Sequence, residues 1–293
     1  MTKYRIGILG TENSHADAFC GIFNKAGENG EYAYPDFRVT YVYGNYAEAS
    51  ENLAKKYDGI KIAESAEEML GKVDAVMVTA RDGKYHAEFA KPFIEAGIPA
   101  FIDKPFTRGV KEAAELIRIA REKKVPLCGG SSLKYSREIA ELKKFAAEKG
   151  VKGGFISAPL NFKNEYGDFW FYSSHLAEMC MEVFGWKPKA VYATENNESV
   201  FAVVDYENFS VTCDFINHGF TAYAGAVFGE SESLVKKVGL DGVEKAETDE
   251  FVKMVRTGET VYGYDELAAP VFLLESIIKS YKTGKKINTG LLC

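Results

Sequence analysis

Residues 4–10 read Tyr4-Arg5-Ile6-Gly7-Ile8-Leu9-Gly10, a short apolar run that ends in a glycine and precedes a helical pattern over residues 15–25. Runs of this kind recur through the first half of the chain and alternate with helical patterns. Apolar residues at consecutive positions are typical of a strand that is covered on both faces. The alternation predicts a doubly wound α/β domain with a parallel sheet, in which ligands bind beyond the carboxyl ends of the strands.

The expected elements of this first domain are short and closely spaced. We expect strands over residues 4–9, 38–43, 75–79, 100–102 and 126–128. We expect helices over residues 15–25, 47–57, 65–70, 84–96 and 110–123. Pro92 should kink the helix over residues 84–96, because proline lacks the N–H that a helix interior needs.

The pattern changes after about Gly150. Strand-like runs follow over residues 151–162, 190–194, 200–206, 209–216 and 222–228, with one helical stretch over residues 175–184. Two further helical patterns lie over residues 243–257 and 264–283. We therefore expect an α+β domain with a mainly antiparallel sheet, and we divide the chain into domains 1–128 and 129–293.

The composition narrows the classes of function. The 293 residues are 46% hydrophobic and 27% charged, which is typical of an ordinary globular protein with two domains. The formal net charge of -6, without a dense basic block, argues against nucleic acid as a partner. No stretch approaches the roughly 20 apolar residues of a membrane span, and the first residues are too short an apolar run for a signal peptide. No membrane contact is expected.

The cysteines suggest neither a disulfide framework nor a zinc site. They are odd in number, widely scattered and without a Cys-x-x-Cys pair: Cys20, Cys128, Cys180, Cys213 and Cys293. This pattern predicts reduced thiols and a cytoplasmic protein.

Five motifs in a fixed order resemble a known family. They are Arg5 to Gly10; Thr79 to His86 followed by Glu95-Ala96-Gly97-Ile98-Pro99; Asp103-Lys104-Pro105, which is similar to a Glu-Lys-Pro motif; His175 on a helix ending Val183-Phe184-Gly185; and a last helix with Ser280, Gly284 and Lys285. Together they resemble the glucose-fructose oxidoreductase and inositol dehydrogenase family, written Gfo/Idh/MocA. The resemblance covers most of the chain.

The resemblance implies a Rossmann-type domain over residues 1–128 that binds NAD or NADP. It implies an α+β domain over residues 129–293 for substrate and oligomerisation, with an open-faced, mainly antiparallel sheet. Lys104 and His175 match the residues that handle the proton of the substrate. The expected cofactor contacts are Gly10, Thr11, Glu12, Asn13, Ser14, His15, Gly44, Asn45, Thr79, Arg81, His86 and Asp103.

The glycine motif of this chain departs from Gly-x-Gly-x-x-Gly, since Glu12 and His15 replace the second and third glycines. A carboxylate ~4 Å from the diphosphate would repel it by about 1 kcal/mol in water and about 4 kcal/mol at an effective dielectric constant of 20. Either the Glu12 side chain points away from the diphosphate, or the cofactor binds with low affinity. The alternative role is structural: Glu12, Asn13 or Ser14 caps the following helix, Ser14 with Asp17 as a capping box.

Two further departures concern the ribose and the proton. The end of the second strand carries Gly44 and Asn45 where an acidic residue usually accepts the ribose hydroxyls. An uncharged site removes one discriminator against NADP, but no arginine follows at once to bind a 2'-phosphate, so the preferred cofactor stays open. The same pair also suits a simple turn. The aspartate that the resemblance implies four residues before His175 is Phe171. Lys104 and His175 can act without it. Each also has a purely structural alternative: Lys104 as a surface lysine and His175 as a buried histidine.

Other residues are weaker candidates. Trp170 and Tyr172 belong to an aromatic cluster suited to stacking on a sugar ring, or to packing on the core. Glu178 lies one helical turn after His175 and is expected to contact the substrate; the pair, with His15 or Asp168, also resembles a metal site, but a structural helix pair is far commoner. No metal is therefore predicted. Arg81 and Asp82 suit a ligand-facing loop or a surface pair, and the alternative role of His86 is packing against Tyr85.

These observations favour an NAD(P)-dependent oxidoreductase of a sugar, polyol or similar small hydroxylated substrate, with hydride transfer at the crevice between the domains. The main alternative is a non-catalytic or regulatory relative that keeps the fold but has lost productive cofactor binding. A metal-assisted lyase or isomerase comes third.

A second copy of the chain is the expected macromolecular partner. Val200, Ala202 and Val204 lie on one face of their strand and Phe201 and Val203 on the other, so both faces of the sheet need a cover. A helix and the first domain can cover one face. We expect a homodimer, or a dimer of dimers, through the other.

Overall fold

The computed structural model describes residues 2–290 and divides into two compact units. The first unit comprises residues 2–103, 114–129 and 248–262, and the second comprises residues 104–113, 130–247 and 263–290. Each unit is built around its own sheet.

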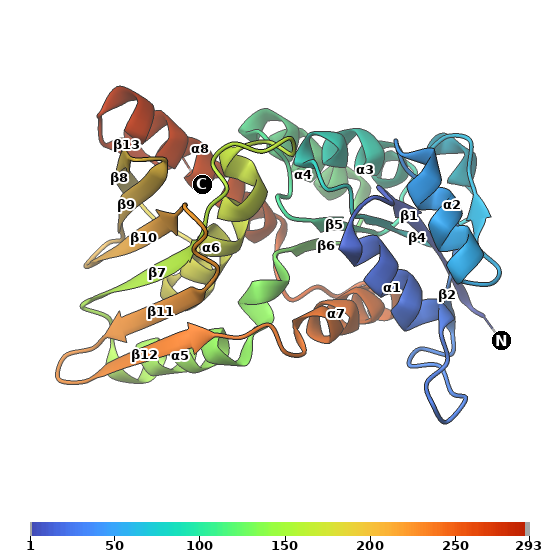
Figure 1. Ribbon diagram of the computed structural model, residues 1–293, viewed down its shortest axis with the longest axis horizontal. Helices are drawn as coiled ribbons and strands as arrows, with labels where there is room; N and C mark the ends of the chain where they lie inside the picture. The colour runs from blue at the N-terminus through green and yellow to red at the C-terminus, as the bar shows by residue number, and fades with distance from the viewer. Residues whose placement is uncertain (1, 291–293) are drawn as a thin grey trace. The chain divides into compact units, whose positions relative to one another are not determined.

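The first unit contains a six-stranded sheet with the order β3-β2-β1-β4-β5-β6 (Figure 1). β1 pairs in parallel with β2 and β4, and the pairs β2–β3 and β4–β5 are also parallel. The strands are β1 (Tyr4–Leu9), β2 (Phe37–Tyr43), β3 (Lys61–Ile62), β4 (Ala75–Val78), β5 (Ala100–Asp103) and β6 (Leu127–Gly130). β4 and β5 are buried along their whole length, as expected for apolar runs covered on both faces, and β5 ends in the buried Asp103. The expected doubly wound α/β fold is confirmed.

The helices between these strands are α1 (Ser14–Asn24), α2 (Ala47–Lys56), α3 (His86–Glu95) and α4 (Val110–Lys123), with Pro92 inside α3. The expected helix over residues 65–70 was wrong: only a 3-10 turn forms, Glu67–Met69. The backbone turns extended at Leu70 and takes a positive φ of 76° at Gly71, which no α-helix continues.

A late segment completes the core of the first unit. The helix α7 (Val243–Thr257) lies beside α1 in Figure 1, and its Phe251 ring contacts the rings of Phe23, Phe37 and Phe101. Polar contacts hold the same helix, since the Tyr34 hydroxyl donates to Asp249 at 2.5 Å.

The second unit contains a seven-stranded mixed sheet with the order β12-β11-β7-β10-β9-β8-β13. The strands are β7 (Gly153–Pro159), β8 (Ala190–Asn196), β9 (Ser199–Asp205), β10 (Ser210–Ile216), β11 (Tyr223–Phe228), β12 (Ser233–Val238) and β13 (Ile287–Asn288). β7 and β10 are parallel, whereas the neighbouring pairs of the other strands are antiparallel. The expected open-faced, mainly antiparallel sheet is confirmed, although β12 and β13 were not expected.

The helices α5 (Arg137–Lys149), α6 (Phe169–Phe184) and α8 (Tyr264–Thr283) pack against the strands of this sheet. Val200, Ala202 and Val204 of β9 are buried, whereas Phe201 and Val203 are 43% and 41% exposed. The helices therefore cover one face of the sheet within this unit, and the face with Phe201 and Val203 is exposed. The helix α5 was missed among the expected elements, although Ile139, Leu142 and Ala146 form an apolar stripe at helical spacing. The expected start of α6 at His175 was six residues late, because the aromatic cluster before it is helical rather than a loop.

The cysteines and the helix lengths complete the description. Cys20, Cys128, Cys180 and Cys213 are buried free thiols, and Cys293 lies outside the described residues. Within residues 2–290, no helix is both long and apolar enough to cross a bilayer. The expected cytoplasmic location stays a prediction.

Candidate active site

The turn after β1 requires a glycine. Gly10 has a φ of +90°, and a Cβ built on it would lie 2.2 Å from the backbone nitrogen of Ala80. The buried Thr79 hydroxyl donates a hydrogen bond of 2.8 Å to the Gly10 carbonyl. The ends of β1 and β4 are thus tied together at the edge of the sheet where ligands bind in such folds.

Asn13 and His15 connect the start of α1 to a buried carboxylate. Asn13 is the N-cap of α1, and its Oδ1 accepts from the His15 backbone N–H at 3.3 Å. Asp103, at the end of β5, accepts from Asn13 Nδ2 at 3.2 Å and lies 2.8 Å from His15 Nδ1. The capping role is confirmed for Asn13, whereas the expected box of Ser14 and Asp17 was wrong, since Asp17 pairs with Lys56.

Glu12 is tied to the loop after β4. Its Oε1 accepts from the Arg81 backbone N–H at 2.9 Å, and its Oε2 is buried without a hydrogen-bond partner among the described residues. The hydrogen bond from the Arg81 backbone therefore fixes the orientation of the Glu12 carboxylate within this unit. The glycine motif is replaced by a turn whose side chains hold neighbouring loops.

Gly44 has a packing role at the end of β2. A Cβ on Gly44 would lie 2.5 Å from Thr11 Oγ1, which is itself 2.9 Å from the Ser50 hydroxyl. Asn45 follows it and is exposed. The turn after β1 and the end of β2 are therefore in close contact, and no side chain at Gly44 could fit between them.

The loop after β4 is held by its own side chains. Asp82 accepts from the Lys84 backbone N–H at 3.0 Å and caps a 3-10 turn over Gly83–Tyr85. The buried His86 ring places Nε2 at 2.8 Å from the Ala80 carbonyl, so that nitrogen carries a hydrogen and donates it. His86 and Asp82 thus shape the loop that presents Arg81.

Lys104 belongs to the second unit and follows Asp103 directly in the chain. It is 6% exposed, and the peptide bond between it and Pro105 is cis. Its Nζ lies 4.7 Å from the centre of the Phe171 ring. Lys104 is therefore not a surface lysine, and the residue that replaces the implied aspartate offers the ammonium an aromatic face in place of a carboxylate.

His175 lies on α6 of the same unit and is 9% exposed. Its Nδ1 is 2.6 Å from the hydroxyl of the buried Ser131. The ring also lies beside Tyr172 and Tyr223, with centroid distances of 6.4 and 6.0 Å. Burial raises the pKa of Tyr223 to about 12, so this phenol keeps its proton at neutral pH.

Glu178 is part of a buried ion pair. Its Oε1 accepts from the Ser131 backbone N–H at 2.8 Å, and its Oε2 accepts from Lys134 Nζ at 2.9 Å. A Cβ on Gly130, where φ is +85°, would lie 2.3 Å from that Oε2. Both carboxylate oxygens are therefore engaged by the protein, which argues for a supporting role rather than the expected contact with substrate.

The remaining predicted contacts divide into two groups. Tyr172 lies beside both Phe171 and His175, whereas Trp170 packs against the hydrophobic core of the second unit. Within residues 2–290, no group of three His, Cys, Asp or Glu side chains is placed to hold a metal ion. Ser131 and Lys134 were missed, although a strand end in a doubly wound fold is where such residues belong.

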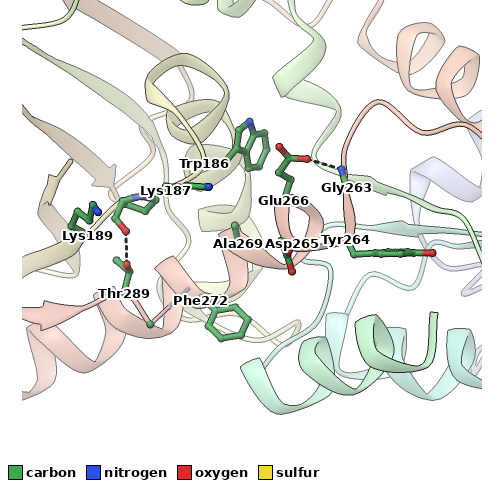
Figure 2. A pocket seen from close by; sticks show the side chains of 12 residues that line it. Trp186, Lys187, Lys189, Gly263, Tyr264, Asp265, Glu266, Ala269, Phe272 and Thr289 are labelled. Atoms are coloured by element: carbon green, nitrogen blue, oxygen red, sulfur yellow. Dashed lines mark hydrogen bonds between the residues drawn. The ribbon is translucent and has the colours of Figure 1, made fainter. Parts of the chain in front are cut away.

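A separate cavity of about 770 Å³ lies at the start of α8. Figure 2 shows Glu266 reaching the backbone of Gly263 on one side, and Trp186 and Lys187 among the lining side chains. It shares no residue with the Gly10–His15 turn or with the cluster of Lys104, His175 and Glu178. We therefore do not take it as the active site.

Comparison with known proteins confirms the resemblance. Residues 4–130 match the profile of the Gfo/Idh/MocA family, described as an oxidoreductase family with an NAD-binding Rossmann fold. The chain is 28% identical over 136 residues to scyllo-inositol 2-dehydrogenase (NADP(+)) IolU of Bacillus subtilis, covering 46% of this chain and 41% of that protein. It is 25% identical over 230 residues to scyllo-inositol 2-dehydrogenase (NADP(+)) IolW of the same organism, covering 67% of this chain and 61% of that one. The matches thus span less than two thirds of these relatives.

Solved structures share the fold along nearly the whole chain. GenD2 from gentamicin A biosynthesis, in complex with NAD, gives a TM-score of 0.82 at 14% identity, covering 98% of this chain and 97% of that one. A putative myo-inositol dehydrogenase from Sinorhizobium meliloti 1021 gives 0.81 at 16% identity, covering 98% and 100%. Residues 4–130 therefore match the Gfo/Idh/MocA family model, and the chain as a whole shares its fold with these solved structures.

Proposed function

We propose, from membership in the Gfo/Idh/MocA family, that this protein is an NAD(P)-dependent oxidoreductase of a sugar, polyol or similar small hydroxylated molecule. The main support for this proposal is that Lys104 is buried and follows directly after the last residue of β5 in the chain. A buried ammonium is costly to maintain, so its retention at this edge favours a role with a ligand. The similarity to two inositol dehydrogenases supports the substrate class.

The residues of the first unit fit the cofactor. Gly10 gives the tight turn, Asn13 organises the first turn of α1, and the N-terminus of a helix favours phosphate groups. Glu12 is bonded to the Arg81 backbone, which holds its charge in one direction. The Gly10–His15 turn would hold the diphosphate, and Gly44 and Asn45 would adjoin the adenosine ribose. When bound, NAD(P) supplies the acceptor or donor of the hydride.

The other proposed cofactor contacts support that turn. Thr79 and His86 fix the ends of β1 and β4 through backbone carbonyls, and Asp103 fixes His15. Arg81 is the member of this loop whose side chain we propose as a direct contact. Because no carboxylate stands at Gly44, we expect NADH and NADPH to bind with similar affinity.

Lys104 and His175 would handle the proton of the substrate. In the oxidation direction, the Lys104 ammonium donates a hydrogen bond to the reacting oxygen, and the imidazole of His175 accepts its proton as the hydride leaves carbon. In reduction the same proton returns from His175 to the oxygen. Imidazole is the side chain whose charge changes most readily near neutral pH, which suits both directions. Tyr172 would lie against the substrate beside His175.

A substrate screen tests this function. NAD+ and NADP+ are offered with a panel of inositols, aldoses and alditols, and reduction is followed by nicotinamide absorbance. We expect at least one polyol or sugar to be oxidised, and Lys104→Met to abolish the signal. A panel-wide lack of turnover together with tight cofactor binding would contradict the substrate class, whereas absent cofactor binding would favour a regulatory relative.

We also propose that a second copy of this chain covers the open sheet face. One row crosses six strands in register: Tyr192, Val203, Thr212, Phe155, Ala226 and Val235. Val235 is 61% exposed and Tyr192 43%, which is an unusually apolar face for a monomer. A homodimer, or a dimer of dimers, would bury it.

Light scattering tests the assembly. We expect a mass at least twice 32.4 kDa at micromolar concentration, and a monomer for Val203→Asp combined with Phe201→Asp. Glu230→Lys, at an exposed turn beyond β11, serves as the control. A monomeric parent protein, or an assembly that survives the double substitution, would contradict the proposal.

A further inference from the structure

Two aromatic rings connect the surroundings of Lys104 to those of His175. The centre of the Phe171 ring lies 4.7 Å from Lys104 Nζ. The same ring lies 4.7 Å from the Tyr172 ring, and the Tyr172 ring lies 6.4 Å from the imidazole of His175, measured between ring centres. All four residues belong to the second unit. Phe171 and Tyr172 therefore form a continuous aromatic wall between the two proposed proton-handling residues.

The start of α6 positions this aromatic wall and leaves part of its surface accessible. The helix begins at the buried Phe169, so Phe171 and Tyr172 lie in its first turn. Both of these residues are half-buried. Tyr166, in the preceding loop, packs with its ring centre 5.1 Å from that of Phe171. The aromatic wall is therefore supported by a neighbouring ring and keeps part of its carbon surface accessible to a ligand.

A substrate that contacts both Lys104 and His175 lies against the aromatic wall. Its reacting oxygen accepts a hydrogen bond of about 2.8 Å from Lys104 Nζ. The carbon next to the reacting one is two bonds from that oxygen, which is close enough for its substituents to reach the Phe171 ring. A phenyl ring has no hydroxyl, amide or carboxylate to pair with. A substrate hydroxyl pressed against it loses water and gains no hydrogen-bond partner in return, which is unfavourable.

We propose that Phe171 is a specificity-determining residue, which selects substrates that carry a C–H group rather than a hydroxyl on the carbon next to the reacting one. The substrate class is therefore a deoxygenated sugar or polyol. An apolar surface rejects an added hydroxyl only by about 10²-fold, so the fully hydroxylated analogue is a poorer substrate rather than an excluded one. The inference rests on the proposed function, because it concerns the substrate of that same site.

Two matched pairs of compounds test this preference: scyllo-inositol with its deoxy analogue, and glucose with 2-deoxyglucose. Removal of one hydroxyl from scyllo-inositol gives a single product, because all its carbons are equivalent. Each compound is offered to the wild-type protein with NAD+ and with NADP+. In each pair that is oxidised, we expect the deoxy member to have a kcat/KM about 10-fold or more above that of its parent. An equal or higher value for the parent would overturn the inference, and this comparison needs no variant to fold.

Variants then test whether Phe171 is the cause. Phe171→Asp should reverse the preference, because a carboxylate accepts a hydrogen bond from the added hydroxyl, whereas Phe171→Leu keeps an apolar surface and should retain it. Phe228→Asp makes the same change at a ring that is 43% exposed at the end of β11, and it should leave the ratio unchanged. An unchanged ratio in a folded Phe171→Asp protein would overturn the inference. If the wild-type protein oxidises no member of either pair, the proposed function fails, and the inference fails with it.

Discussion

The Gly10–His15 turn and the first turns of α6 depart from the family pattern in opposite directions. The turn gains a carboxylate at Glu12, and the helix loses one at Phe171. In both places a neighbouring element compensates: the Arg81 backbone binds the added carboxylate, and the Phe171 ring and the Ser131 hydroxyl contact Lys104 and His175. The effect of a charge change on the site therefore cannot be judged from one position alone, because it depends on the hydrogen-bond partners of that side chain.

The largest expected effect comes from breaking the buried ion pair between Lys134 and Glu178 of α6. Lys134→Met leaves the Glu178 carboxylate buried without its ammonium, so we expect a loss of about 3–5 kcal/mol in the free energy of unfolding. Urea unfolding followed by circular dichroism measures it. Lys144→Met, at an exposed pair with Glu148 on α5, should cost about 1 kcal/mol or less.

The double variant Lys134→Met with Glu178→Leu sharpens this prediction. Replacing both charges with apolar side chains removes the stranded carboxylate, so much of the lost stability should return. If Lys134→Met is no less stable than Lys144→Met, the ion pair does not hold Ser131 in place, and the start of α6 is not compensated in the way described.

The next effect concerns the proton-handling residues. Lys104→Met and His175→Ala should each lower kcat/KM by about 10²-fold or more, because each removes a group that contacts the reacting oxygen or its proton. Steady-state kinetics on an identified substrate measures this, with exposed Lys111→Met as the control. Near wild-type turnover in either folded variant would remove that residue from the mechanism.

The smallest expected effect is on cofactor affinity and concerns the Gly10–His15 turn. Glu12→Gln keeps an oxygen for the Arg81 N–H and removes the charge, so NADH should bind more tightly by about 1 kcal/mol, or roughly 5-fold. Glu12→Gly also removes the contact with Arg81, and comparison of the two separates charge from anchoring. Weaker binding by Glu12→Gln in a fluorescence titration would show that the carboxylate helps to bind the cofactor.

Most of the first unit could be predicted from the sequence, because β4 is apolar at every position and β1 and β5 are largely so. It failed where local pattern is weak: β3 is two exposed residues, and α6 begins after Asp168, whose φ of +53° no pattern reveals. Lys104 and His175 were identified from the family resemblance. Ser131 and Lys134 could not be identified from the sequence, because their roles depend on contacts with Glu178, which is 47 and 44 residues away.

Titration of the purified protein with NADH and NADPH, followed by nicotinamide fluorescence, asks directly whether the first unit binds a nicotinamide nucleotide. We expect saturable binding of both at micromolar to submillimolar concentrations, with the Gly10–His15 turn as the site. Gly10→Ala should abolish it, because a Cβ there would lie 2.2 Å from Ala80. No binding of either nucleotide up to millimolar concentration would contradict a nucleotide site at this turn and favour a relative that keeps the fold without the cofactor.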